Sequence, residues 1–302
     1  MSVASAYHQP QSLHKALELL AAGDAQIIAG ATDIYPARVP DRAWARPAAS
    51  TCWVDISRVP ELAGIRQTAS GWRLGAGVTW ADIQASSLPP AFDALRAASA
   101  EVGGLQIQHR ATLTGNLCNA SPAADGVPAL LCLEAEVELQ SLSGERRLPL
   151  AQFITGNRQT LRAPDELVTA VHIPHSELTR GGRSAFHKLG ARRYLVISIV
   201  MAAAVVTTDS MQRVESISLA VGACSPVATR LRGLEQALIN QPLDASIIDV
   251  VAAEHFADLS PIDDVRASGE YRLQQARNAV CQLLLTLAQS PSPHAMASGR
   301  IS

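Results

Sequence analysis

Residues 111–125 read ATLTGNLCNASPAAD, and this stretch decides which fold the chain can adopt. It places small residues, turn formers and hydrogen-bonding side chains where a core would need bulk. Gly115 has no β-carbon, so backbone N–H groups beside it can approach an anion closely. A tight surface loop would have a similar composition. The density of polar groups favours a ligand site instead, and these groups are Thr112, Thr114, Asn116, Asn119, Ser121 and Asp125.

A second stretch with related character lies earlier in the chain. Residues 27–33 read IIAGATD, an apolar run that ends in a small and polar turn. No G-x-G-x-x-G follows Ile28, and the flanking elements do not alternate as in a Rossmann fold. The two stretches together predict the two sides of a site for a phosphate-containing cofactor. In such a site Asp125 would accept hydrogen bonds from sugar hydroxyls, because its charge disfavours a phosphate.

Composition limits the kind of protein that carries this site. With 302 residues and 48% hydrophobic residues, the chain is long enough for two or three domains with their own cores. The net charge of -2 argues against a nucleic-acid-binding protein. The longest apolar run, residues 195–206, is shorter than the ~20 residues of a membrane helix. The N-terminus lacks the pattern of a secretory signal, so we expect a cytoplasmic protein.

Few residues indicate chemistry by the chain itself. The five cysteines are scattered singly, without the spacing of zinc or iron–sulfur ligands, so no metal site is expected. No histidine pair or nucleophile motif is present, although His109 directly precedes the polar stretch. Arg192, Arg193 and Tyr194 form either a solvated edge or a surface for a planar, anionic cofactor. The lack of an obvious acid, base or nucleophile in the sequence favours a protein whose chemistry belongs to a redox cofactor.

Hydrophobic periodicity predicts an α+β fold in which strands and helices are segregated. A polar segment, residues 175–183, separates a first part from a second part with three antiparallel strands and a block of helices. Gly75 and Gly77 are interpreted as a turn between a hairpin and a helix. The predicted strands are 26–29, 53–56, 63–67, 72–76, 136–141, 147–150, 167–173, 184–189, 197–207 and 214–221, and the main predicted helices are 12–22, 79–84, one opening at 89–90, 127–133, 231–240, 245–257 and 269–289.

The order and separation of the two stretches resemble the FAD-binding medium subunits of the molybdenum hydroxylases, the xanthine dehydrogenase and carbon monoxide dehydrogenase group. Residues 186–193, FHKLGARR, and the helix bearing Ser268-Gly269-Glu270-Tyr271-Arg272 are similar to the C-terminal domain of these subunits. Many relatives have glycine pairs where this chain has Gly30-Ala31 and Thr114-Gly115. The chain shows no extra cysteine-bearing loop, so the additional iron–sulfur cluster of some relatives is not expected.

The resemblance implies a domain organisation and a set of cofactor contacts. Residues 1–175 would form an FAD-binding domain of the vanillyl-alcohol-oxidase (PCMH) type, with subdomains at about 1–55 and 56–175. Residues 176–290 would form a small C-terminal domain with a three-stranded antiparallel sheet, and 291–302 a flexible tail. Tyr194 would lie near the exposed side of the flavin. The implied FAD-binding residues are Ile28, Ala29, Gly30, Ala31, Thr32, Asp33, Ile34, Ala111, Thr112, Gly115, Asn116, Asn119, Ser121, Asp125 and Lys188.

By the same resemblance, the chain would be an electron-transfer subunit of a heterotrimeric enzyme. A large subunit would hydroxylate the substrate at a molybdenum cofactor, and a small subunit would carry two [2Fe–2S] clusters. FAD would pass the electrons to an external acceptor such as NAD, oxygen or a carrier. Two alternatives remain open: a stand-alone flavin oxidoreductase of the same superfamily, and a flavin-binding sensor or assembly protein without redox function.

Overall fold

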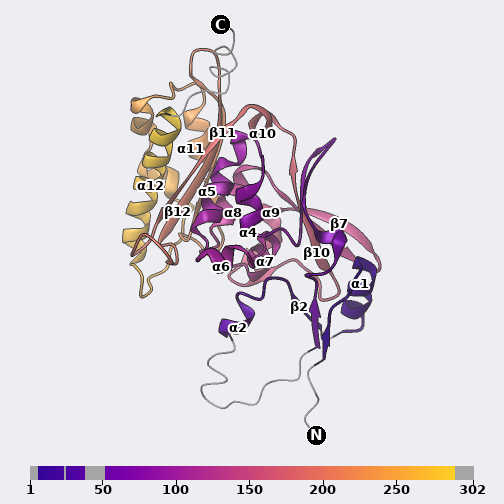
Figure 1. Ribbon diagram of the computed structural model, residues 1–302. Coiled ribbons are helices and arrows are strands. Elements are labelled where there is room, and N and C mark those ends of the chain that lie inside the picture. Colours follow the sequence, from indigo (N-terminus) through magenta and orange to yellow (C-terminus); the bar gives the residue numbers. More distant parts are fainter. Residues whose placement is uncertain (1–5, 24, 38–51, 290–302) are drawn as a thin grey trace.

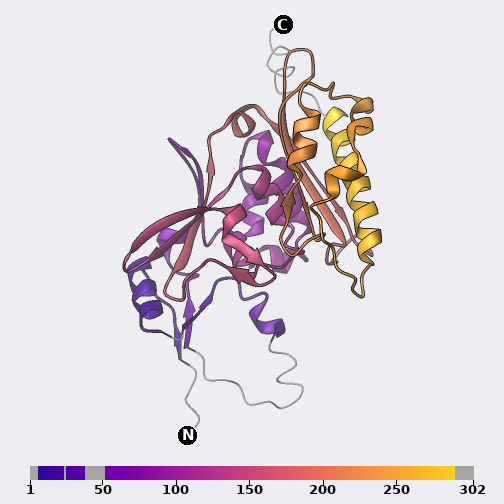
Figure 2. The same ribbon diagram turned by 180° about the vertical axis from the view of Figure 1, so that it is seen from behind.

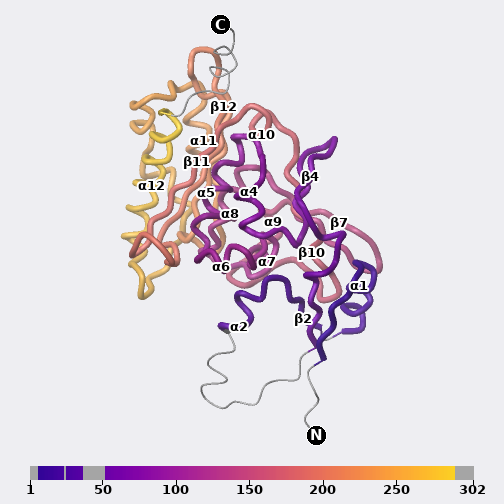
Figure 3. The backbone as a smooth tube through the Cα atoms, viewed as in Figure 1, coloured from indigo at the N-terminus to yellow at the C-terminus, as the bar shows by residue number. Residues whose placement is uncertain are grey.

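The computed structural model describes residues 6–23, 25–37 and 52–289. The described residues combine helices with four sheets (Figure 1). The N-terminal elements, in indigo, and the last helix, α12 (Gly269–Gln289), lie at opposite flanks of the molecule, and Figure 3 traces the backbone between them. None of the described helices is both long and apolar enough to span a bilayer. The tail predicted for 291–302 lies outside the described residues.

The N-terminal elements form a small sheet of three parallel strands. Its order is β1-β3-β2, from β1 (Tyr7–His8), β3 (Cys52–Asp55) and β2 (Ala25–Ile28). Ser12 caps α1 (Leu13–Ala21), because its hydroxyl accepts a hydrogen bond from the Lys15 amide. The helix buries one apolar stripe against the sheet. Strand β2 ends at Ile28, and the turn at residues 29–33 and the short helix α2 (Ile34–Ala37) follow it.

A second sheet has five antiparallel strands in the order β4-β5-β10-β6-β7. The predicted hairpins around residues 69–71 and 143–144 form its two outer pairs. One face packs into a core with the helices that carry the second polar stretch. Its strands are β4 (Ile65–Thr68), β5 (Gly71–Gly75), β10 (Leu167–Pro174), β6 (Glu136–Ser141) and β7 (Gly144–Pro149), and the helices between them are α4 (Trp80–Ala85), α5 (Asp93–Glu101), α6 (Leu105–Gln108), α7 (Leu113–Asn119), α8 (Gly126–Cys132) and α9 (Leu150–Phe153). A short hairpin, β8 (Ile154–Gly156) with β9 (Gln159–Thr160), follows α9.

The C-terminal sheet has four strands, so the prediction of three was wrong. Its order is β11-β12-β13-β14, from β11 (Arg183–Leu189), β12 (Val200–Thr208), β13 (Val214–Gly222) and β14 (Thr229–Arg230). The fourth strand pairs through only two residues with β13. A two-residue strand is too short to show the alternation by which strands are recognised in a sequence.

Strand β12 is buried on both faces and joins the two parts of the molecule. Ala203 and Val205 pack into the core that contains α5 and α8. Ala202 and Ala204 point the other way, into the core beneath α11 (Arg232–Leu238) and α12. Figure 2 shows the orange and yellow helices on the outer face of this sheet. The sheet is therefore a middle layer between helices from both parts of the chain.

Two further local predictions differ from the structure. The helix predicted at 245–257 is two 3-10 helices, Ala245–Val250 and Ala253–Phe256. The β-branched pair Val250-Val251 lies at the break, where helix propensity is low. The polar segment at 175–183 contains a helical turn, α10 (Glu177–Gly181), whose capping box is formed by Ser176 and Thr179.

The five-stranded sheet carries a buried carboxylate on the face opposite its apolar core. Glu138 accepts hydrogen bonds from Thr169 at 2.6 Å and from Arg73 at 2.9 Å. His172 contacts its other oxygen at 2.5 Å, and Arg147 does so at 3.2 Å. Burial alone would raise the pKa of Glu138, but the hydrogen bonds from Thr169, Arg73 and His172 outweigh burial and lower the pKa to about 2.

Because of this cluster, we expect the free energy of unfolding to fall in acid. A carboxyl whose pKa is lowered by folding stabilises the protein above its unfolded pKa, near 4.5, and loses that contribution as the pH falls towards 2. Between pH 5 and 2, Glu138 should account for on the order of 3 kcal/mol of the lost free energy of unfolding. Urea unfolding at several pH values should therefore give a flatter profile for Glu138→Gln. An equally flat profile for the exposed Glu254→Gln would contradict this assignment.

Candidate functional site

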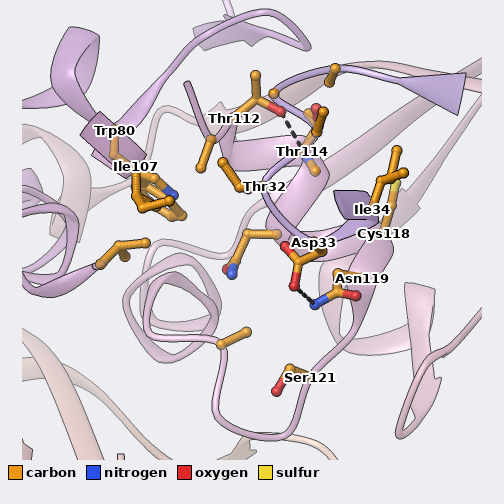
Figure 4. A pocket seen from close by; sticks show the side chains of 18 of the residues that line it. Thr32, Asp33, Ile34, Trp80, Ile107, Thr112, Thr114, Cys118, Asn119 and Ser121 are labelled. Carbon is orange, nitrogen blue, oxygen red and sulfur yellow. Dashed lines mark hydrogen bonds between the residues drawn. The ribbon is translucent and has the colours of Figure 1, made fainter. Parts of the chain in front are cut away.

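The two polar stretches line one cavity of about 950 Å³ (Figure 4). This volume is at the upper end of the ~300–1,000 Å³ of ligand sites, as a large cofactor would need. Further walls come from α4, the turn before α6, the β8–β9 hairpin and the segment 195–197. Of the predicted site residues, those that line the cavity are Ala29, Gly30, Ala31, Thr32, Asp33, Ile34, Ala111, Thr112, Gly115, Asn116, Asn119, Ser121 and Asp125.

The first stretch is pressed directly against the second. A β-carbon on Gly30 would lie 2.0 Å from the carbonyl oxygen of Arg110 and 2.9 Å from the α-carbon of Ala111. Only glycine permits this approach of two backbones. Ala31, the next residue, has a φ of 63°, in the left-handed region. The turn therefore places the backbone of 29–33 along one wall of the cavity.

Part of the second stretch forms the short helix α7 (Leu113–Asn119). Thr112 caps α7, because its hydroxyl oxygen accepts a hydrogen bond from the Gly115 amide at 3.0 Å. The buried Thr114 hydroxyl donates to the carbonyl of Ala76 at 2.9 Å. Ala120, with a φ of 47°, ends the helix. The small and polar residues thus form a rigid wall that is tied to the five-stranded sheet.

A chain of hydrogen bonds connects both stretches to the β8–β9 hairpin. The Asn119 amide nitrogen donates to Asp33 at 3.0 Å, as Figure 4 shows. The Asn119 amide oxygen accepts from the Arg158 guanidinium at 2.7 Å. The Asn119 side chain therefore bridges the Asp33 carboxylate and the Arg158 guanidinium at the same edge of the cavity.

Asp125 forms a buried ion pair with the C-terminal part of the chain. Its carboxylate accepts from Lys188 Nζ at 2.7 Å and from the Ser198 hydroxyl at 2.5 Å. Lys188 also donates to the carbonyl of Glu101 at 3.2 Å. Burial raises the pKa of Asp125, against the opposing effects of Lys188 and Ser198. Its contact with sugar hydroxyls stays a prediction.

Three predicted site residues do not line the large cavity. Ile28 ends β2, and its carbonyl accepts a hydrogen bond from the Ile56 amide at 2.9 Å. Lys188 faces a smaller neighbouring cavity, together with Arg192 and Arg193. Tyr194 is 65% exposed, and the Arg193 guanidinium lies over its ring. His109, which adjoins the second stretch, is exposed and does not line the cavity either.

The structure adds wall residues that the sequence did not indicate. Trp80 begins α4, and its indole Nε1 is buried without a hydrogen-bond partner among the described residues. Asn116 Oδ1 is likewise buried without a partner. Arg158 and Arg162 come from the β8–β9 hairpin and the segment after it. No spacing rule could find these residues, because each is brought to the cavity by the tertiary fold.

Comparisons with known proteins identify the family. Residues 2–176 match the model of the FAD binding domain in molybdopterin dehydrogenase, and residues 184–287 match the CO dehydrogenase flavoprotein C-terminal domain. The chain therefore belongs to the FAD-binding subunits of the molybdopterin dehydrogenases, which are oxidoreductases. This confirms the family resemblance found in the two stretches.

Individual relatives agree over nearly the full chain. The chain is 34% identical to 6-hydroxypseudooxynicotine dehydrogenase complex subunit alpha from Paenarthrobacter nicotinovorans, covering 91% of each chain. It is 31% identical to the xanthine dehydrogenase FAD-binding subunit from Escherichia coli O157:H7, covering 89% of this chain and 91% of the relative. Among solved structures, a chain of the Cu,Mo-CO dehydrogenase superposes with a TM-score of 0.85 at 26% identity, over 95% of this chain and 99% of the other.

The left-handed Ala31 gives a prediction about stability. An alanine at positive φ costs about 1–2 kcal/mol, and glycine would remove this cost while adding about 0.5–1 kcal/mol of entropy loss on folding. Ala31→Gly should therefore raise the free energy of unfolding by about 0.5–1 kcal/mol in urea titrations. Ala29→Gly, at a backbone without positive φ, should lower it. Equal losses in both variants would contradict the strain at Ala31.

Proposed function

We propose that this chain is the FAD-binding electron-transfer subunit of a heterotrimeric molybdenum hydroxylase. A large molybdopterin-binding subunit and a small [2Fe–2S] subunit would complete the enzyme. The external electron acceptor would be NAD, oxygen or a carrier, and the complex would act in the cytoplasm. The observation that carries the proposal is the large cavity lined by both polar stretches of a chain in this family.

The chemistry of the cavity fits FAD. When bound, FAD supplies the redox chemistry by taking up electrons from one partner and passing them to another. Polar side chains that are not fully buried line the cavity and can exchange hydrogen bonds with a ligand, among them Thr32, Asn119 and Ser121.

Each wall of the cavity has a proposed task in holding the cofactor. The backbone of residues 29–33 would bind the diphosphate, with Ile28 and Ile34 flanking it. Thr112, Gly115, Asn116 and Asn119 would hold the phosphates and the ribityl chain, while Ser121 and Asp125 would complete the polar network. Lys188 would lie near the isoalloxazine, and Tyr194 near the exposed side of the flavin. Residues 1–175 and 176–290 would form the two domains, the first of the PCMH type.

Flavin analysis of the purified chain tests the proposal. We expect noncovalent FAD, released by heat or acid and identified by chromatography, in a ratio near one per chain. A colourless chain that does not take up added FAD would contradict the proposed function. Co-purification with a molybdopterin protein and an iron–sulfur protein would support the subunit assignment. A stable, active monomer would instead favour a stand-alone oxidoreductase, and a bound flavin that no donor reduces would favour a sensor.

A further inference from the structure

We infer that Arg158 is a specificity-determining residue that binds the diphosphate of FAD and makes the site prefer a dinucleotide over a flavin without phosphate. This inference rests on the proposed function, because it assumes that FAD occupies the large cavity. It concerns a residue that lies outside both polar stretches, on the turn between β8 and β9.

The charge balance of the cavity calls for a cation. The diphosphate of FAD carries two negative charges, and Asp33, Glu101 and Asp125 also line the walls. Lys188 pairs with Asp125 and lines the neighbouring cavity. Within the described part of the chain, Arg158 and Arg162 are the basic residues in the wall of the large cavity. A cation beside the diphosphate would add charge-assisted hydrogen bonds to those that backbone N–H groups can donate, and such bonds are stronger than neutral ones.

Of these two arginines, Arg158 is the better placed. Arg162 Nη1 donates to the carbonyl oxygens of Ala163 and Glu166, at 3.0 and 2.8 Å, and so holds the loop that leads into β10. Arg158 makes one described side-chain hydrogen bond, to Asn119, and its side chain is exposed at the cavity edge. Because a guanidinium carries five N–H donors in a fork, it can bind a phosphate while it keeps the bond to Asn119.

The fold holds Arg158 in place beside the first stretch. Its backbone amide donates to the carbonyl of Ala120 at 2.9 Å, so the hairpin is docked onto the end of α7. Its φ of 56° is left-handed, a conformation that costs an arginine free energy and persists only where neighbours enforce it. Asn119 then links the guanidinium to Asp33, the last residue of the turn proposed to bind the diphosphate.

Flavin-affinity measurements on the full chain test this role. The flavin-free protein is titrated with FAD and with riboflavin, which has no phosphate, by fluorescence quenching. Arg158→Ala should weaken FAD binding about 10- to 100-fold, as expected for a lost charge-assisted hydrogen bond. Riboflavin binding should change less than twofold. Arg158→Lys should recover part of the loss, because it keeps the charge but not the fork. Arg180→Ala, at an exposed arginine away from the cavity, is the matched control and should bind FAD as the parent chain does.

Salt dependence gives a second readout that does not need riboflavin. FAD binding to the parent chain should weaken as KCl rises, and the slope should be smaller for Arg158→Ala, since screening acts on the charge that was removed. Equal losses of FAD and riboflavin, or an unchanged salt slope, would mean that Arg158 only supports the hairpin and would overturn the inference. If the parent chain binds no flavin at all, the proposed function fails instead.

Discussion

Gly30→Ala is expected to give a folded chain that purifies without FAD. The new methyl group would lie 2.0 Å from the Arg110 carbonyl oxygen, a contact that no rotamer change can relieve, because both atoms belong to or adjoin the backbone. The turn at 29–33 must then move away from α7, and the cavity loses one wall. We expect the FAD content to fall below about a tenth of the parent value, since displacements of this size disrupt several hydrogen bonds at once.

The matched control for this variant is Gly233→Ala in α11. There the added β-carbon would meet only His255, at 3.8 Å, an ordinary contact. This variant should keep its FAD and its stability. Circular dichroism and flavin absorbance of the two proteins separate loss of the site from loss of the fold. A Gly30→Ala protein with full FAD content would show that the two backbones can separate without harm to the site.

Among the variants described, Lys188→Met should lower the free energy of unfolding most. It leaves Asp125 in a buried position without its cation, and removing one partner of a buried ion pair costs about 3–5 kcal/mol. The chain has only two lysines, so Lys15→Met is a natural control. Lys15 pairs with Glu18 at 2.7 Å on the exposed face of α1, where solvent screens the pair, so its loss should change stability little.

The effect of Lys188→Met should depend on pH. Burial already raises the pKa of Asp125, and Lys188 opposes this effect, so its removal lets the pKa rise further. A carboxyl whose pKa is raised by folding stabilises the protein most when it is protonated, and this contribution is lost as the pH rises through the folded pKa. The deficit measured by urea unfolding should thus be greatest at neutral pH and shrink towards pH 4. A deficit that stays constant with pH would contradict an unpaired Asp125 as its cause.

The sequence predicted most of the elements, and thirteen of the predicted site residues line the cavity. The caps at Ser12 and Thr79 and the alternation in residues 136–141 are local signals, and the structure contains each of these elements. The sequence also predicted a turn after the apolar run at residues 27–29, but it did not predict the close approach of Gly30 to the backbone of Arg110. Strand β14 was missed because two residues carry no periodicity.

Other parts of the site could not be predicted, because they depend on long-range packing. Arg158 belongs to a segment for which the sequence predicted no element, and Trp80 belongs to what looks like an ordinary helix start. Only the fold brings Arg158 to Asn119, 39 residues away. The pairing of Lys188 with Asp125, over 63 residues, depends on how the C-terminal sheet packs against the first part of the chain. Local patterns hold no information about such distances.

Strand β12, which is buried on both faces, also limits which segments can be exchanged between related chains. Its residues Ala203 and Val205 complete the core of the N-terminal part, and Cys132 Sγ donates a hydrogen bond to the Ala203 carbonyl at 3.2 Å. A chimaera that takes residues 184–287 from a relative would replace part of the other module's interior. An exchange between homologues would therefore succeed only where the side chains of α8 and β12 that pack against each other are transferred together.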